Sequence, residues 1–258
     1  MSMGFYVSPE QQIKDKADFA RKGISRGRPL VVLEYADGIA FVAENPSTHL
    51  HKIAEIYDRI AFAGVGKFSE LENLRVAGVR LADIRGYSYG REDVTSRAIA
   101  NFYSQNLGQI FIQEPKPYEI ELCVAEVGTE GAANALYHVL YDGTVVDRKG
   151  FLAMGGQSDE LNAELQRSYR EGLDLGGAID LAVRTLRAAS PSGDSTTRLE
   201  IAVLERGRPR RAFRRLSQED VTALTGTGTR AGTGNGAGPE TGTGADPETG
   251  TGAAKGSP

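Results

Sequence analysis

The sequence has one cysteine, no tryptophan and only three histidines among its 258 residues. A single thiol cannot form an internal disulfide, so the chain suits a reducing compartment such as the cytoplasm. Cys123 lies in the alternating run YEIELCVAEVG, which predicts a strand with Ile120, Leu122 and Val124 on one face and a buried, unreactive thiol. His49 and His51 stand two apart in a polar loop without the further ligands that a zinc site needs. We therefore expect surface histidines, and no metal or cofactor.

Long apolar runs and an excess of positive charge are also missing. The longest apolar stretches, such as IAFVA, are far too short to cross a bilayer. The first residues lack the basic and then apolar pattern of a signal peptide, so we expect a cytoplasmic protein without a membrane partner. The net charge of −4 gives no sign of a nucleic-acid partner.

One short segment is strongly basic, the run RPRRAFRR from Arg208 to Arg215. Such a run can form a patch for nucleic acid or for an acidic partner. It can also be the edge of a hairpin whose arginines pair with carboxylates of the same chain or of a neighbouring one. The overall acidity of the chain favours the second interpretation.

The remaining pattern consists of paired strands and paired helices. Ser8, Pro9 and Gln11 form a helix start, with serine as cap and glutamine completing a capping box, and this helix should end near Lys22. From Pro29 to Gly66 the sequence predicts a hairpin with a turn at Asp37-Gly38, then a basic loop and two short strands. Helical spacing or strand alternation follows in these segments: helices over 69–82 and 93–111, strands over 116–128 and 134–154, helices over 158–172 and 173–190, strands over 198–216, and a short helix from 217.

This element order predicts the fold class. Strands that come in hairpins and helices that come in pairs argue against alternating βαβ units. They favour an α+β protein in which two antiparallel sheets lie between two helical layers. From about Gly226 the chain is rich in glycine and threonine and repeats PETGTGA, so residues 226–258 should form a disordered tail.

Two further patterns carry little chemistry by themselves. Gly64, Gly66 and Lys67 resemble part of a phosphate-binding loop, but Ala61 and Phe68 occupy positions where the full pattern requires glycine and Ser/Thr. We expect a strand-to-helix connection there. No G-x-S-x-G nucleophile pattern occurs, although a Ser/His/Asp triad dispersed along the chain stays open.

The order of several blocks resembles a proteasome α-subunit of the actinobacterial type. These blocks run in sequence through residues 5–220: YVSPEQ, ARKGI, FVAENPS, KIAEIYDR, GKFSELENLR, RGYSYGREDVT, KPYEIELCVAEV, YDG, MGG and RPRRAFRR. The resemblance implies the four-layer αββα sandwich of the N-terminal-nucleophile hydrolases, with an additional N-terminal helix. It divides the chain into a mobile gate segment (1–8), a proteasome α-type domain (9–225) and the tail.

The resemblance also implies roles and partners. Seven copies would form a ring that caps rings of catalytic β-subunits and admits unfolded protein substrates. Lys52 would receive the C-terminal carboxylate of an activating AAA ATPase, which delivers proteins tagged with a ubiquitin-like protein, and Gly27, Gly66 and Lys67 would line the same site. The axial pore would be closed by the N-terminal segment, which consists of Met1, Ser2, Met3, Gly4, Phe5, Tyr6, Val7 and Ser8.

Catalysis should be absent from this chain. A catalytic sibling begins its first strand with a free threonine, whose α-amine activates its own hydroxyl. Alignment places Arg28 at that position, inside a continuing chain, and Glu44 where the sibling has a supporting aspartate. The chain departs from the family in two places. It lacks the Tyr-Asp-Arg and Gly-Arg-Leu elements of archaeal and eukaryotic α-subunits, so the gating details of those relatives are not applied to this chain. The glycine- and threonine-rich tail is also not part of the family pattern.

Three hypotheses follow in order of preference. The first is an inert ring subunit that gates substrate entry and docks a regulator. The second is a self-processing N-terminal-nucleophile hydrolase that exposes an internal threonine or serine. The third is a separate binding module that uses the run RPRRAFRR.

Overall fold

The computed structural model describes residues 8–189 and 198–226. The predicted gate residues Met1–Val7 and the predicted tail from 227 onward lie outside them. The helices are α1 (Pro9–Ser25), α2 (Phe68–Ser88), the single 3₁₀ turn η1 (Arg91–Asp93), α3 (Ser96–Gln113), α4 (Ser158–Ser168), α5 (Leu175–Ala189) and α6 (Gln218–Gly226). The strands are β1 (Leu30–Tyr35), β2 (Gly38–Glu44), β3 (Ile53–Tyr57), β4 (Ile60–Gly66), β5 (Ile120–Glu126), β6 (Ala135–Val139), β7 (Val145–Arg148), β8 (Phe151–Met154), β9 (Leu199–Glu205) and β10 (Phe213–Arg215).

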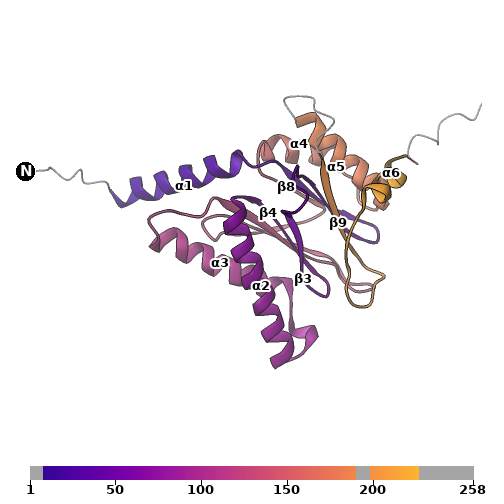
Figure 1. The fold of residues 1–258 in the computed structure, drawn as a ribbon, viewed down its shortest axis with the longest axis horizontal. Coiled ribbons are helices and arrows are strands. Elements are labelled where there is room, and N and C mark those ends of the chain that lie inside the picture. Colours follow the sequence, from indigo (N-terminus) through magenta and orange to yellow (C-terminus); the bar gives the residue numbers. More distant parts are fainter. Residues whose placement is uncertain (1–7, 190–197, 227–258) are drawn as a thin grey trace, which may run out of the picture.

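Two antiparallel sheets stack face to face in the described part of the chain (Figure 1). One sheet has the order β10-β9-β2-β1-β8, and the other has the order β3-β4-β5-β6-β7. Helices α4 and α5 cover the outer face of the first sheet, and α2 and α3 cover that of the second. This arrangement is the predicted αββα sandwich, so the fold class is confirmed.

The central strands are buried on both faces, which explains their nearly continuous apolar runs. In β1, Leu30 and Val32 point into the layer between the sheets, whereas Val31 and Leu33 point toward α4 and α5. In β5, Cys123 faces the intersheet layer. The opposite face of β5 packs against α2 and α3 through Ile120, Leu122 and Val124, the three residues that the alternation placed on one face.

The first hairpin forms as predicted, but its turn lies one residue earlier. Tyr35 pairs directly with Gly38, so the two turn residues are Ala36 and Asp37. Gly38 belongs to the ladder, where a Cβ would come within 1.9 Å of the Leu204 carbonyl oxygen. The glycine is therefore required by the close approach of β9 rather than by the turn conformation.

Helix boundaries depart from the sequence pattern at several places. Helix α1 continues three residues beyond Lys22 to Ser25, and α2 continues beyond the predicted end at residue 82 as far as Ser88. Helix α3 begins at Ser96, after the 3₁₀ turn, because Thr95 caps it by accepting a hydrogen bond from the Ala98 amide. Alternation and helical spacing identify the elements, whereas caps and tertiary contacts decide their ends.

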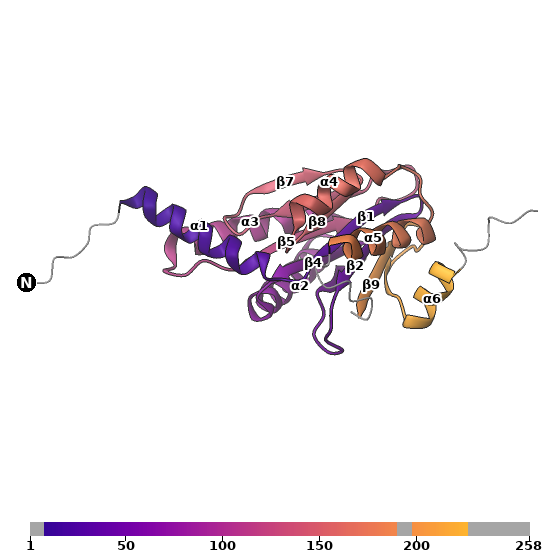
Figure 2. The same ribbon diagram turned by 90° about the horizontal axis from the view of Figure 1, so that it is seen from above.

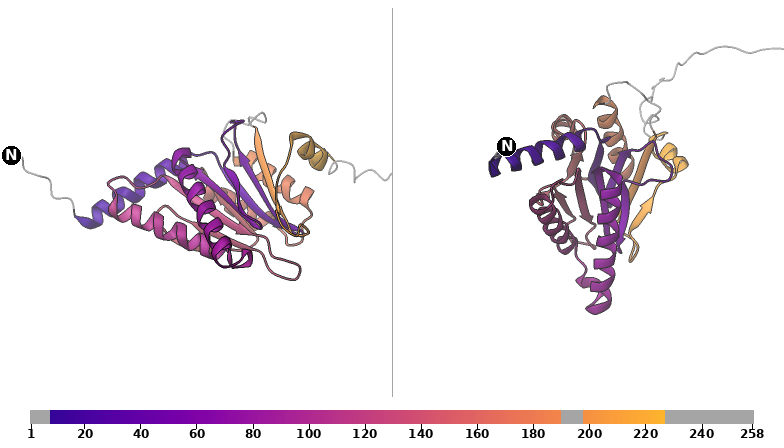
Figure 3. Two further views of the ribbon diagram at one scale, coloured as in Figure 1. Left: turned by 60° about the horizontal axis from the view of Figure 1, so that its bottom comes forward. Right: turned by 60° about the vertical axis from the view of Figure 1, so that its left-hand side comes forward.

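Helix α1 projects beyond the two sheets, as the different views show (Figures 2 and 3). Ser8 caps it by accepting a hydrogen bond from the Gln11 amide at 3.2 Å, which confirms the predicted start and cap. The Gln11 side chain donates to Asp15 Oδ1 at 2.6 Å along the helix rather than completing the expected capping box. Ala17, Ala20 and Ile24 are buried at its base, but Ile13 is 58% exposed. The Lys16 ammonium ties the helix to the end of α3 by donating to the carbonyl oxygens of residues 111, 112 and 114.

None of the helices in residues 8–189 and 198–226 is long and apolar enough to cross a membrane.

Candidate functional site

The four residues proposed for regulator docking come from three separate connections. Gly27 lies in the link from α1 to β1, and Lys52 directly precedes β3. Gly66 ends β4, and Lys67 leads into α2. Since β3 and β4 pair side by side, and the Gly27 backbone approaches Gly66, the fold brings all four to the same end of the sandwich.

Lys52 is held through both its backbone and its side chain. Its carbonyl oxygen accepts a hydrogen bond from the Gly64 amide at 3.0 Å, which extends the β3–β4 ladder by one pair. Its ammonium donates to the Arg28 carbonyl oxygen at 2.7 Å. Because an ammonium has three donors, further donors of Lys52 can serve a ligand.

Burial and neighbouring charges act in opposite directions on the pKa of Lys52. Burial lowers the pKa of Lys52 to about 8, and the neighbouring Arg28 cation contributes to this fall. The carboxylates of Glu200 and Glu44 oppose it. At neutral pH the side chain is thus a partly desolvated cation, which is the kind of group that binds an anion strongly.

Close packing requires glycine at positions 27 and 66, because any side chain there would collide with the fold. A Cβ on Gly27 would lie 2.6 Å from Val65 Cγ1. Gly66 has a φ of +123°, and a Cβ on it would lie 1.9 Å from the Glu119 carbonyl oxygen. Both glycines are half-buried, and the Gly27 amide donates to the Ile24 carbonyl oxygen at 2.8 Å, so this part of the site is close-packed backbone without side chains.

Lys67 contributes a second cation at the start of α2. Its amide donates to the Glu119 carbonyl oxygen at 3.0 Å, and its ammonium lies 3.7 Å from Glu70 Oε1. The side chain is 54% exposed. The segment from Gly64 to Lys67 is a strand-to-helix connection, as the incomplete phosphate-loop pattern led us to expect.

The sequence interpretation missed one group at this site, the carboxylate of Glu200 on β9. It accepts a hydrogen bond from the Lys52 amide at 2.9 Å and is itself buried. A signal was present, because Glu200 shares its strand face with Ala202 and Leu204, which pack between the sheets. An acidic residue on such an inward face requires partners.

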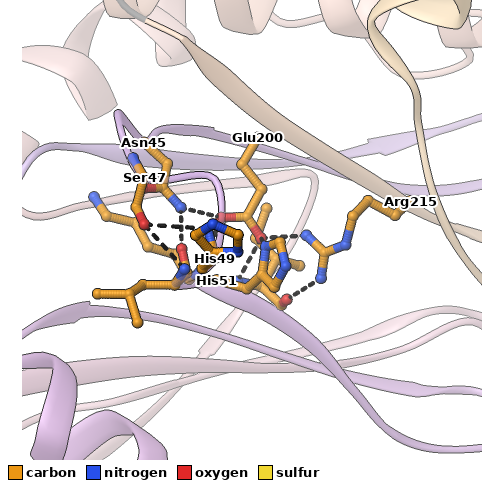
Figure 4. Close-up of polar contacts among 9 residues, drawn as sticks. Asn45, Ser47, His49, His51, Glu200 and Arg215 are labelled. Atoms are coloured by element: carbon orange, nitrogen blue, oxygen red, sulfur yellow. Dashed lines mark hydrogen bonds and ion pairs between the residues drawn. The ribbon is translucent and has the colours of Figure 1, made fainter.

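A hollow of about 690 Å³ opens beside the loop that precedes β3. Figure 4 shows His49 and His51 of this loop near Glu200 and Arg215. His49 and His51 line one part of the hollow, and Arg211 and Arg215 line another. Both histidines are exposed, as expected. His138 differs, because it is buried and its Nε2 lies 2.9 Å from Glu121 Oε2.

The basic run pairs with carboxylates of its own chain. Arg211 Nε lies 2.8 Å from Glu55 Oε2, and Arg214 Nη2 lies 2.7 Å from Glu205 Oε1. Arg215 pairs with Glu200. These contacts confirm the hairpin-edge interpretation, and they leave fewer free cations for nucleic acid.

Two other residues singled out in the sequence have no catalytic arrangement in the structure. Cys123 is completely buried, and this burial raises the pKa of its thiol. Arg28 stands inside the continuing chain before β1, with its guanidinium 4.0 Å from Glu44 Oε2. Within residues 8–189 and 198–226, no group of three His, Cys, Asp or Glu side chains is arranged to hold a metal ion.

Comparison with known proteins decides the family. The family profile described as "Proteasome subunit" matches residues 24–204. The chain belongs to the proteasome subunit family. It is 58% identical over 226 residues to the proteasome subunit alpha of Xylanimonas cellulosilytica, covering 84% of this chain and 93% of that protein. The protein of the same name from Kineococcus radiotolerans is 57% identical over 237 residues, covering 88% of this chain and 100% of that protein.

A third relative, the proteasome subunit alpha of Acidothermus cellulolyticus, is 58% identical over 220 residues, with 83% of this chain and 94% of that protein covered. These relatives are α-subunits from actinobacteria, so the resemblance read from the sequence blocks is confirmed. The chain is of the α type found in the proteasome core particle, and it assembles with other proteasome subunits.

Proposed function

We propose that this chain is a non-catalytic subunit of a heptameric α ring that caps the β-subunits of a threonine protease. Its ring admits unfolded protein substrates and docks an AAA ATPase, which delivers proteins tagged with a ubiquitin-like protein. We propose that the ring acts in the cytoplasm. The family membership supports the assembly role, and the geometry around Lys52 supports the docking role.

The observation that carries the docking role is the position of the Lys52 ammonium. It is partly buried, donates to the Arg28 carbonyl oxygen, and lies at the same end of the sandwich as Gly27 and Gly66. A C-terminal carboxylate entering this site would meet a desolvated cation. A charge-assisted hydrogen bond of this kind is about twice as strong as a neutral one.

The proposed absence of catalysis rests on the first strand. The residue aligned with the catalytic threonine is Arg28, and its amine is part of a peptide bond. An amide nitrogen is not a base, so the threonine mechanism has neither nucleophile nor base at this place. The gate is assigned to Met1–Ser8 through the family resemblance, and this segment directly precedes α1 in the sequence.

The docking role is tested by replacing Lys52 with alanine in assembled α/β barrels. Lys52→Ala should abolish the ATPase-stimulated degradation of a tagged protein and leave the hydrolysis of a short fluorogenic peptide intact. Lys149→Ala is the matched control, because Lys149 is an exposed lysine at the β7–β8 turn of the same chain. Unchanged stimulation in Lys52→Ala barrels would refute the docking role.

The inert role is tested separately by native mass and peptide turnover, with and without a co-expressed β-subunit. Turnover only in the large assembly with β supports an inert partner. A chain that loses mass through self-cleavage and hydrolyses peptide without β would instead support the self-processing hydrolase.

A further inference from the structure

Glu200 connects the two sheets next to the backbone of Lys52. It lies on β9 and is 8% exposed. Its Oε2 accepts hydrogen bonds from the Lys52 amide at 2.9 Å and from Asn45 Nδ2 at 2.6 Å. Its Oε1 accepts one from the Ile53 amide at 3.2 Å and pairs with the Arg215 guanidinium. Figure 4 shows these donors converging on the carboxylate from different segments.

The loop between β2 and β3, residues 45–52, is closed around this carboxylate. Asn45 at its start donates to the Leu50 carbonyl oxygen at 2.7 Å and accepts from the Ser47 amide at 3.0 Å. Ser47 Oγ accepts from the Leu50 amide at 3.0 Å. Glu200 thus holds the first residue of the loop through a side chain and the last residue through its backbone amide.

The backbone anchor decides where the Lys52 side chain begins. The Lys52 amide is fixed by Glu200 and its carbonyl oxygen by Gly64, so the Cα between them cannot shift without breaking one of these bonds. From this Cα the flexible side chain reaches the Arg28 carbonyl oxygen. Fixing the backbone reduces the freedom that a carboxylate ligand would otherwise have to restrict.

We propose that Glu200 is a positioning residue for docking: it holds the backbone at Lys52 so that the ammonium meets the C-terminal carboxylate of the regulator. This inference rests on the docking role proposed for Lys52. The sequence separation of 148 residues means that a distant strand controls the site.

A carboxylate is required at position 200 rather than an amide. Four donors, from Asn45, Lys52, Ile53 and Arg215, point at its two oxygens. A glutamine side chain has only one oxygen, and its NH2 group would face some of these donors without being able to accept a hydrogen bond from them. Arg215 also donates to the Ile53 carbonyl oxygen at 2.7 Å and offsets the negative charge of Glu200, which limits repulsion of an incoming carboxylate.

The same carboxylate also joins the sheets, so the test must separate positioning from stability. The probe is a fluorescein-labelled peptide that carries the last residues of the ATPase and ends in a free carboxylate. Its Kd is measured by fluorescence anisotropy on assembled α/β barrels with wild-type α, Lys52→Ala, Glu200→Gln or both changes. The thermal unfolding midpoint and native mass of each barrel are recorded alongside.

Glu34→Gln provides a matched control for the loss of a structural carboxylate. Glu34 lies on β1 of the same sheet as Glu200, and it accepts hydrogen bonds from the Gly150 amide at 2.8 Å and from Asn134 Nδ2 at 2.9 Å. It contacts none of the residues at the docking site described above. We expect Glu34→Gln to bind the peptide as the wild type does.

Glu200→Gln should weaken peptide binding about tenfold, the loss expected when one charge-assisted contact is misplaced. The double variant should bind no more weakly than Lys52→Ala alone, because Glu200 acts through Lys52. Such non-additivity is the signature that a purely structural role lacks.

Three results would contradict part of the account, and they are distinguishable. Wild-type binding by Glu200→Gln, or a double variant whose losses add, overturns the positioning role and leaves Lys52 in place. Wild-type binding by Lys52→Ala removes the docking role itself.

If Glu200→Gln barrels do not assemble, the variant Glu200→Asp replaces them. It keeps the charge but withdraws the oxygens by one methylene, and it too should bind about tenfold more weakly. Wild-type binding by Glu200→Asp would then overturn the inference.

Discussion

Raising the pH should release a docked regulator within a range where an ordinary lysine stays charged. The cause is the environment of Lys52, whose burial lowers its pKa to about 8 despite the nearby carboxylates of Glu200 and Glu44. Only the protonated, cationic form attracts a C-terminal carboxylate. Affinity should therefore be nearly full well below pH 8 and should fall as the pH rises through that value.

The magnitude follows from the fraction of Lys52 that is charged in the free ring. With a pKa of about 8, roughly 90% is charged at pH 7 and roughly 10% at pH 9. The apparent Kd of the peptide should then increase about tenfold between these values, which equals about 1.4 kcal/mol. A lysine with an unperturbed pKa of about 10.4 would lose only a few per cent of its charge over the same interval.

The assay is fluorescence anisotropy of the carboxylate-ended peptide on assembled barrels at half-unit steps from pH 6.5 to pH 9.5. Lys52→Ala barrels provide the control and should show weak binding that does not change with pH. Native mass at each pH confirms that the ring stays assembled. A wild-type Kd that is constant from pH 7 to pH 9 would rule out this pH dependence, because Lys52 would then either keep its charge or not contact the peptide.

Three other changes have expected outcomes that simpler measurements check. Gly66→Ala should destabilise the barrel by about 1–3 kcal/mol in thermal unfolding, because its φ of +123° suits glycine and a Cβ would lie 1.9 Å from the Glu119 carbonyl oxygen; an unchanged midpoint would contradict this. Phe41→Ala should cost about 3–5 kcal/mol by emptying the layer between the sheets, and a loss below 1 kcal/mol would argue against tight packing there. Deleting Met1–Ser8 should increase fluorogenic peptide hydrolysis by the barrel, and no increase would argue against the gate.

Much of the fold was predictable because its elements follow regular patterns. The alternation of Ile120, Leu122 and Val124 identified one buried face, and Ser8 with Gln11 marked the start of α1. The sequence pattern placed the turn of the first hairpin one residue too late, because Asp-Gly, here Asp37-Gly38, is a common pair of turn residues. In this protein the glycine serves the contact of β2 with β9, which a local pattern does not contain.

Less of the site was predictable from the residues alone. Lys52 stood out through the family resemblance, since a lysine in a polar loop is by default a solvated surface charge. Its lowered pKa arises from burial and from the Arg28 cation, against the opposing carboxylates of Glu200 and Glu44, and this balance depends on the tertiary arrangement. Glu200 itself was missed because its role depends on the pairing of β9 with β2 and on the approach of the loop that precedes β3. Such long-range contacts come from the stacking of the two sheets.

The contact between Lys52 and the C-terminal carboxylate of the regulator can be observed directly. The measurement is a cryo-EM reconstruction of the assembled barrel saturated with the carboxylate-ended peptide at pH 7. We expect peptide density that ends within about 4 Å of Lys52 Nζ, beside Gly27 and Gly66, with the loop at residues 45–52 still anchored on Glu200. Peptide density that ends elsewhere on the ring, with Lys52 contacting only the Arg28 carbonyl oxygen, would contradict the docking role.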